Sequence, residues 1–339
     1  MRNRSPSTLV YLLTVLVLLL MMFLGIKRYL ATAPFIEEVT GSRIVIYIKS
    51  HTGAMEIARS LEEAGVVSSR WLFLAYSLFR GSIDKMRPGE YEFRPDMSLE
   101  EILTKLVQGK VIAHQVTIPE GYTLREIARL LAAEGLADEG RFIALSSDPE
   151  ILTAHGIEGR TLEGYLFPDT YNLTKGVNEE EIIHKMLSRF HQAFGPEELQ
   201  RARQLRMSVY QVVTLASIIE KEAAVPMERP LISGVFHNRL RRGMPLQADP
   251  TVIYGLSRFN GRLSRRDLYS KSSYNTYIQV GLPPGPIANP GKASLQAALY
   301  PENTKYLYFV SKNDGTHYFS TSPGEHERAV RRYQLRRGQ

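Results

Sequence analysis

A glutamate on the apolar face of a predicted helix is the residue of this sequence best placed to do chemistry. Ser208 is a good N-cap residue, and the pattern after it predicts a helix to about Ala224. Glu220 falls within the apolar face of that helix, and Glu222 lies near its border. Because desolvation disfavours a charged carboxylate, Glu220 is suited to be a general acid. The alternative is a glutamate paired with a buried arginine.

Residue types that suit a carbohydrate ligand follow in loop-rich sequence. Aromatic faces pack on sugar rings, and amides hydrogen-bond to hydroxyl and N-acetyl groups. Asp169 is a further candidate to lie near Glu220, and Glu222 is a candidate to support the acid. Packing within loops, or at the domain boundary for Asp169, is the alternative. The residues expected in a glycan groove are Gln247, Asp249, Tyr254, Tyr274, Asn275 and Tyr277.

Four segments are specific in combination. They are the helix that carries Glu220, the run Asp249-Pro-Thr-Val-Ile-Tyr-Gly255, the run 273–277 and the run 281–287. With them the chain resembles the endolytic murein transglycosylases, the MltG or YceG-like family, over nearly its whole length. The resemblance implies an enzyme that cleaves MurNAc–GlcNAc bonds inside nascent peptidoglycan strands, leaves 1,6-anhydro-MurNAc ends and so ends strand elongation. It also implies that Glu220 is the catalytic glutamate.

A lytic transglycosylase can work with one carboxylate, whereas the usual glycosidase needs two. The acid protonates the leaving oxygen, and the resulting carboxylate takes the proton of the muramic acid 6-hydroxyl as that oxygen attacks the anomeric carbon. Two other functions remain open on the sequence alone. One is a hydrolytic muramidase, which leaves reducing ends. The other is a non-catalytic peptidoglycan-binding scaffold that organises cell-wall synthases.

The composition excludes several kinds of site. The 339 residues include no cysteine, so disulfides and Cys-ligated metals are excluded, and the eight histidines show no metal-binding spacing. We therefore expect no metal and no cofactor. The formal net charge is +7, and it falls to +3 without the four basic residues that flank the first apolar run. This charge does not indicate a nucleic-acid partner.

The first apolar run, over residues 9–26, is long enough to span a bilayer. Lys27 and Arg28 separate it from a segment at 31–33 that resembles a signal-peptidase site, so we predict an uncleaved anchor. We expect residues 1–8 to lie in the cytoplasm. The catalytic part would then lie outside the inner membrane, in the periplasm or its equivalent.

An internal repeat follows a linker over 27–40. Residues 46–65 parallel residues 116–135, and each copy predicts a strand, a turn and an amphipathic helix that ends at a glycine. Such units resemble LysM folds, which bind glycan strands, and a spacer without a ligand is the alternative. The predicted fold is α+β: an anchor, a LysM-like domain over 41–160 and a mostly helical, loop-rich catalytic domain over 161–335.

Overall fold

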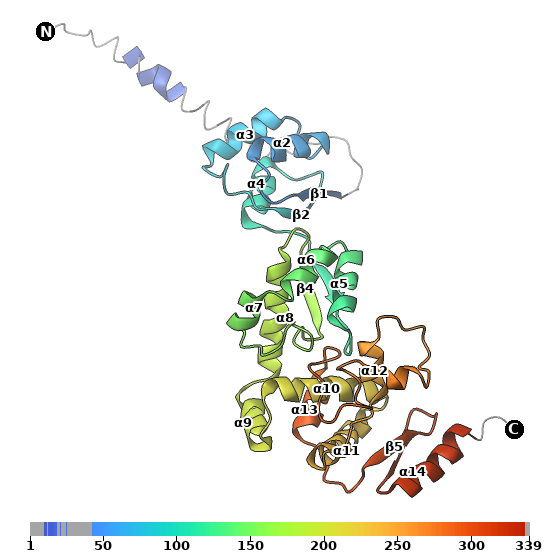
Figure 1. Ribbon diagram of the computed structural model, residues 1–339. Helices are drawn as coiled ribbons and strands as arrows, with labels where there is room; N and C mark the ends of the chain where they lie inside the picture. Colours follow the sequence, from blue (N-terminus) through green and yellow to red (C-terminus); the bar gives the residue numbers. More distant parts are fainter. Residues whose placement is uncertain (1–9, 12, 19–20, 22–24, 26–42, 336–339) are drawn as a thin grey trace. The chain divides into compact units, whose positions relative to one another are not determined.

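The computed structural model describes residues 10–11, 13–18, 21, 25 and 43–335 (Figure 1). The described chain combines runs of consecutive helices with short strands that pair in separate two-stranded sheets, so the fold is α+β, as predicted. The described residues form two compact units. Unit 1 contains 43–114 and 172–177, and unit 2 contains 115–171 and 178–335. This division differs from the predicted boundary near residue 160, because the chain leaves unit 1 earlier and returns to it once.

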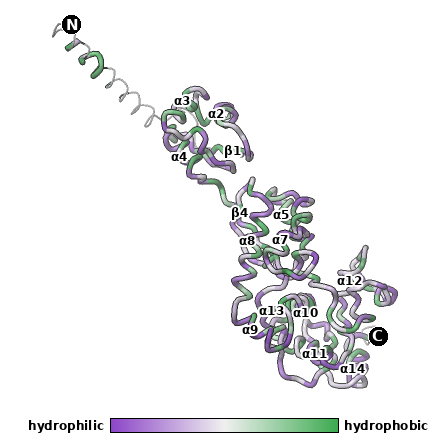
Figure 2. The backbone as a smooth tube through the Cα atoms, turned by 60° about the vertical axis from the view of Figure 1, so that its left-hand side comes forward, coloured by the Kyte–Doolittle hydropathy of each residue, from purple (hydrophilic) through white to green (hydrophobic). Residues whose placement is uncertain are grey.

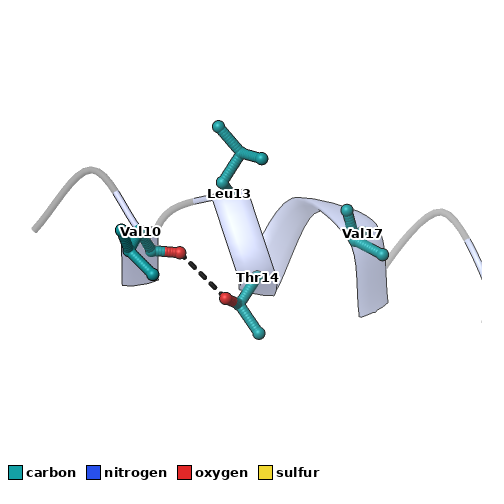
Figure 3. Close-up of a pocket in the computed structure, with 4 residues that line it drawn as sticks. All are labelled: Val10, Leu13, Thr14 and Val17. Atoms are coloured by element: carbon teal, nitrogen blue, oxygen red, sulfur yellow. Dashed lines mark hydrogen bonds between the residues drawn. The ribbon is translucent and has the colours of Figure 1, made fainter. Parts of the chain in front are cut away.

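Eight of the eighteen residues of the predicted anchor lie outside the described residues. Its described part is helical, and the Thr14 hydroxyl donates a hydrogen bond to the Val10 carbonyl oxygen over 2.8 Å (Figure 3). Figure 2 shows this part as predominantly hydrophobic. The hollow drawn in Figure 3 is lined by Val10, Leu13, Thr14 and Val17, none of which is titratable. No helix within the described residues is both long and apolar enough to cross a membrane.

Unit 1 is a strand–helix–helix–strand arrangement followed by a further helix. Its elements are β1 (Ile44–Ile48), α2 (Ala54–Glu63), α3 (Arg70–Phe79), β2 (Gly89–Phe93) and α4 (Leu99–Gln108). β1 and β2 pair antiparallel, and α4 begins at a capping box between Ser98 and Glu101. Residues 172–177 complete the unit, since Lys175 donates a hydrogen bond to Oε1 of Glu90 over 2.8 Å.

The second copy of the repeat opens unit 2. Its elements are β3 (His114–Thr117), α5 (Leu124–Ala133), α6 (Glu139–Leu145), α7 (Pro149–Ala154) and β4 (Thr170–Leu173). β3 pairs with β4, as β1 pairs with β2. Gly65 and Gly135 follow α2 and α5 with φ of +72° and +66°, a conformation that glycine adopts without strain. The predicted repeat is therefore confirmed at the level of its elements.

The rest of unit 2 is mostly helical and also contains an antiparallel hairpin of two strands, β5 and β6. Its longer elements are α8 (Glu179–Ala193), α9 (Pro196–Leu205), α10 (Val209–Glu222), α11 (Arg229–Arg241), α12 (Asp249–Gly255), α13 (Lys292–Leu299), β5 (Tyr308–Ser311), β6 (His317–Ser320) and α14 (Pro323–Val330).

α10 is the central helix of this part. It packs against α9, α11, α12 and α13, and every residue from Val212 to Ile219 is buried. Ser208 caps it in a box with Gln211. The helix ends at Glu222, two residues before the predicted end, so Glu222 occupies its last turn.

Candidate active site

A cavity of about 510 Å³ in unit 2 brings together four residues that the sequence analysis selected separately. They are Glu222 at the end of α10, Asp249 at the start of α12, Gln247 just before it, and Tyr277. α11 contributes Arg239, and the β5–β6 hairpin and α14 form the remaining wall. Helix ends and a hairpin thus hold these polar side chains around one space.

The surroundings of Glu222 in this cavity strongly change the pKa of its carboxyl group. Burial, together with the nearby negative charge of Asp249, raises the pKa of Glu222 to about 8. The guanidinium of Arg239 and a hydrogen bond from the Asp249 backbone N–H act in the opposite direction. The last turn of a helix also disfavours a negative charge. Glu222 is therefore protonated at neutral pH and can donate a proton into the cavity.

Arg239 connects several of the chain segments that line the cavity. Its side chain is nearly buried and donates hydrogen bonds to the carbonyl oxygens of Leu246 and Leu307 over 2.8 and 2.6 Å. It also donates to Oε1 of Gln247 over 3.1 Å, and its guanidinium lies 5.1 Å from the ring centroid of Tyr308. Burial lowers the pKa of Arg239. The arginine ties the segment before α12 to the hairpin and leaves the amide nitrogen of Gln247 for a ligand.

Asp249 is oriented by Tyr277, whose hydroxyl donates a hydrogen bond to Oδ1 over 2.6 Å. Burial and the Asp249 carboxylate both raise the pKa of Tyr277, so its hydroxyl stays protonated. The cavity therefore holds one protonated carboxyl group, one hydrogen-bonded carboxylate and one buried guanidinium.

The side chain of Glu220 is only 6% exposed, but its carboxylate is engaged outside this cavity. Its Oε1 accepts a hydrogen bond from Arg229 over 3.0 Å, and its Oε2 accepts one from the backbone N–H of Gly291 over 2.9 Å. Arg229 also lies 3.8 Å from Glu120. A Cβ at position 291 would meet the carboxylate of Glu120, the end of a half-exposed side chain, which would have to move. These contacts correspond to the alternative left open on the sequence, a glutamate paired with a buried arginine.

Glu163 is a buried carboxyl group that the sequence analysis did not select. Oε1 accepts hydrogen bonds from the Leu124 backbone N–H and the Asn289 amide over 2.9 and 3.0 Å. Oε2 accepts one from the Tyr254 hydroxyl over 3.2 Å. Burial raises the pKa of Glu163 to about 7 despite these bonds. Its position in the run 162–171, beside a glycine and several aromatics, gave no signal that distinguishes it from a surface glutamate.

Tyr254, Tyr274 and Asn275 were predicted to lie in the same groove, but they are not among the residues that line the cavity. The rings of Tyr254 and Tyr274 pack with centroids 4.9 Å apart. Asn275 is fully buried, and its amide donates to the carbonyl oxygens of Leu268 and Ser270 over 3.0 and 2.9 Å. Its Oδ1 accepts the backbone N–H of Tyr277. We therefore treat Asn275 as a loop-organising residue, the packing alternative, and not as a ligand contact.

Asp169 is engaged away from the carboxylates of α10. It accepts a hydrogen bond from Arg189 of α8 and one from the Thr170 backbone N–H over 2.8 Å. The hydrogen bond from Arg189 lowers the pKa of Asp169. This agrees with the interpretation of Asp169 as a packing residue near β4. Among the described residues, no group of three or more His, Cys, Asp or Glu side chains is placed to hold a metal ion.

Comparison with known proteins places this architecture in a family. A sequence profile described as the YceG-like family matches residues 46–332. The chain belongs to the YceG-like family. This YceG-like chain is 34% identical over 313 residues to a protein of Bacillus subtilis (strain 168) named endolytic murein transglycosylase, and the match covers 88% of this chain and 87% of that protein.

Two further relatives of this YceG-like chain extend the comparison. A protein of Streptococcus pneumoniae serotype 2 (strain D39), also named endolytic murein transglycosylase, is 29% identical, and the match covers 91% of this chain but 61% of that protein. A crystal structure of a putative YceG-like protein from Listeria monocytogenes superposes with a TM-score of 0.59 at 34% identity. That match covers 84% of this chain and 98% of the Listeria chain.

Proposed function

We propose that this chain is an endolytic murein transglycosylase, a lyase that acts on the glycan strands of peptidoglycan. Two relatives carry that name, and one of them matches most of the chain at 34% identity. The observation that carries the chemistry is the protonated Glu222, which faces the same cavity as Asp249, Gln247 and Tyr277. A general acid with a pKa near the working pH is what cleavage of a glycosidic bond requires.

In the proposed reaction Glu222 donates its proton to the glycosidic oxygen as the bond from that oxygen to the anomeric carbon of MurNAc breaks. The ionised Glu222 then takes the proton from the 6-hydroxyl group of the same MurNAc, while that oxygen bonds to the anomeric carbon. The proton returns to Glu222, and the product is a 1,6-anhydro-MurNAc end. No water is consumed, and general acid–base catalysis contributes about 10²–10⁴-fold.

Asp249 has a separate role in this proposal. The transition state of glycosidic cleavage carries positive charge at the anomeric carbon. The Asp249 carboxylate, held by Tyr277, stabilises that charge and also raises the pKa of Glu222 before the reaction. Gln247 and Tyr277 supply an amide and an aromatic ring for the sugar.

The geometry favours Glu222 over Glu220 as the proton donor. Glu220 already accepts hydrogen bonds from Arg229 and Gly291, and Glu222 lines the cavity. We assign Glu220 the task of fixing the end of α10 against α11 and the loop before α13. The family resemblance implied that Glu220 is the catalytic glutamate. The segment that carries this resemblance contains both Glu220 and Glu222, so it fits either residue.

One observation is also consistent with a second enzymatic reaction. A pair of carboxyl groups that face one cavity, Glu222 and Asp249, is also what a hydrolytic muramidase uses. The two reactions differ in whether water or the MurNAc 6-hydroxyl attacks the anomeric carbon. The non-catalytic scaffold is not favoured, since it gives no reason for a protonated carboxyl group in a ligand-sized cavity.

We further propose that the catalytic unit works at the outer face of the inner membrane, held by an anchor over 9–26, and that it meets cell-wall synthases there. The strand–helix–helix–strand order of unit 1, with its paired outer strands, supports a LysM-like, glycan-binding role for this unit. These proposals rest on the sequence pattern and the element order.

The decisive experiment is mass spectrometry of glycan strands after digestion by the full-length protein. Internal cleavage with anhydro ends supports the proposal, and reducing ends identify a hydrolase. Glu222→Gln removes the proton donor with little change in side-chain size, and Lys221→Gln provides a matched control on the adjacent helical position. Strands left intact by the wild-type protein after prolonged incubation would refute both enzymatic functions.

A further inference from the structure

A basic loop connects α12 to the segment that returns to the cavity. Residues 256–273 contain five basic residues and one acidic residue. All five basic side chains are exposed, and the ion pairs found within the described part of the chain include none of them. The basic residues of this loop are Arg258, Arg262, Arg265, Arg266 and Lys271.

The loop is internally organised. Asp267, its acidic residue, accepts hydrogen bonds from the backbone N–H and the hydroxyl of Ser264 over 2.8 and 2.6 Å. Asn260 accepts one from the Arg262 backbone N–H over 3.2 Å. The buried amide of Asn275 holds the carbonyl oxygens of Leu268 and Ser270. Asp267 is therefore used to shape the loop, and the basic side chains point outward from an ordered backbone.

The basic loop is connected to the proposed active site through the segments on both of its sides. α12 starts at Asp249 in the cavity and leads into the loop, and the chain returns to the cavity at Tyr277. Figure 1 shows the loop, in orange, projecting beyond α12. A second hollow of about 500 Å³ is lined by Leu256, Arg258, Phe259, Asn260 and Asp267. A ligand that extends out of the cavity along α12 would therefore meet this surface.

The arginine and aromatic side chains of the loop suit an anionic ligand that also has some apolar surface. Arginine pairs well with carboxylates, and its side chain keeps its charge at any physiological pH. Phe259 and Tyr269, which are 44% and 77% exposed, add aromatic surface to the same loop. Murein glycan carries such a ligand beside each cleavable bond, because the lactyl group of MurNAc bears a short peptide that ends in a free carboxylate.

We propose that the basic loop binds the carboxylate-bearing peptide stems of murein next to the bond that is cleaved, and so makes the enzyme prefer peptide-substituted strands over bare glycan. The inference rests on the proposed function for its substrate. Phosphate-rich ligands such as nucleic acid share the charge, but they have no reason to be aligned with a sugar cavity. The continuity of the loop with α12 favours a ligand that occupies both places.

The test compares two forms of one substrate. Glycan strands are prepared with their peptides, and half are stripped with an N-acetylmuramoyl-L-alanine amidase. Retention of the full-length protein on each form and its initial cleavage rate are measured at low and high salt. The loop variant is Arg258→Ala with Arg262→Ala. The matched control is Lys185→Ala with Arg203→Ala, which removes two charges from α8 and α9, away from the loop (Figure 1).

We expect the wild-type protein to bind peptide-bearing strands more tightly than stripped strands, with the difference shrinking at high salt. The loop variant should lose binding to peptide-bearing strands by roughly three- to thirty-fold, given the usual strength of exposed ion pairs. It should cleave stripped strands at the wild-type rate, and the control should match the wild type on both forms.

Equal binding of the two forms by the wild-type protein would overturn the proposal. A loop variant that is equally impaired on both forms would also overturn it, since the loop would then act only by shaping the site. A wild-type protein that cleaves neither form refutes the proposed function, yet its retention on the two forms still decides whether the loop binds the stems.

Discussion

The hydroxyl of Tyr277 donates a hydrogen bond to Oδ1 of Asp249 over 2.6 Å. This bond joins the first residue of α12 to the chain beyond the basic loop, so the stretch of chain that contains α12 and the loop begins and ends at the cavity. The negative charge of Asp249 raises the pKa of Glu222. Tyr277 therefore acts on the proton donor through Asp249.

Tyr277→Phe should move the pH dependence of the reaction. Without the hydroxyl, the charge of Asp249 is less compensated and repels an ionised Glu222 more strongly, so the alkaline limb of kcat should shift to higher pH. We expect kcat at neutral pH to fall about three- to ten-fold, as for loss of one hydrogen bond. Tyr318→Phe on β6 is the control, and an identical pH profile in both variants would contradict the role given to Tyr277.

Glu220→Gln and Glu222→Gln should separate stability from catalysis. Glu222→Gln should lower kcat by about 10²–10⁴-fold, because it removes the proton donor. Glu220→Gln should instead destabilise the fold by about 1–3 kcal/mol, because Arg229 loses its charged partner. Product formation and melting temperature of both variants are the measurements. An active Glu222→Gln with an inactive, fully folded Glu220→Gln would reverse the assignment.

The raised pKa of Glu222 fixes the direction of the pH dependence. Between its ordinary value of 4.5 and about 8, the folded state holds the proton that the unfolded state has lost, so stability decreases as pH rises through this window. Activity should fall above about pH 8 as Glu222 ionises. Urea denaturation from pH 5 to 9 should show a shallower decline for Glu222→Gln. A wild-type stability that rises over this range would argue against a protonated Glu222.

Glu163 offers a test based on hydrogen-bond counting. In Glu163→Gln the amide oxygen can still accept from Leu124 and Asn289, and the amide nitrogen can donate to the Tyr254 hydroxyl, so the change should be mild. Glu163→Ala leaves these buried groups without their acceptor and should cost about 2–4 kcal/mol. Thermal melts compare the two. Equal destabilisation by both changes would mean that the charge, not the hydrogen bonding, matters.

Asn275→Ala tests whether this residue organises the loop or contacts the sugar. Loss of its amide frees two loop carbonyl groups, so the melting temperature should fall, with a free-energy loss of about 1–3 kcal/mol. Tyr274→Ala, in the same segment, removes an aromatic face and should lower turnover on glycan more than stability. A stable Asn275→Ala with poor substrate binding would restore the sugar-contact interpretation.

Local patterns predicted most of the elements, since their causes are local. The cap at Ser208 and the glycines after α2 and α5 each arise from a few neighbouring residues. Spacing alone could not rank the two glutamates of α10. The helix is buried on all sides over 212–219, so an apolar face has little meaning there.

The surroundings of Glu222 come from distant parts of the chain. Asp249 and Tyr277 lie 27 and 55 positions later in the sequence. The pattern of residues in α10 therefore could not predict that they share a cavity with Glu222. For Asn275 the composition was misleading. An amide between tyrosines is typical of a sugar-binding site, but the side chain of Asn275 forms its hydrogen bonds within its own loop.

Unit 1 is assembled from two separate stretches of chain, and this limits how the protein can be divided. A cut after residue 114 would remove Lys175 from Glu90 and leave the unit without its closing segment. The shortest fragment that could be exchanged between relatives with unit 1 intact extends to Val177 and takes the second repeat with it. Modular recombination in this lineage would therefore transfer both repeats together rather than one at a time.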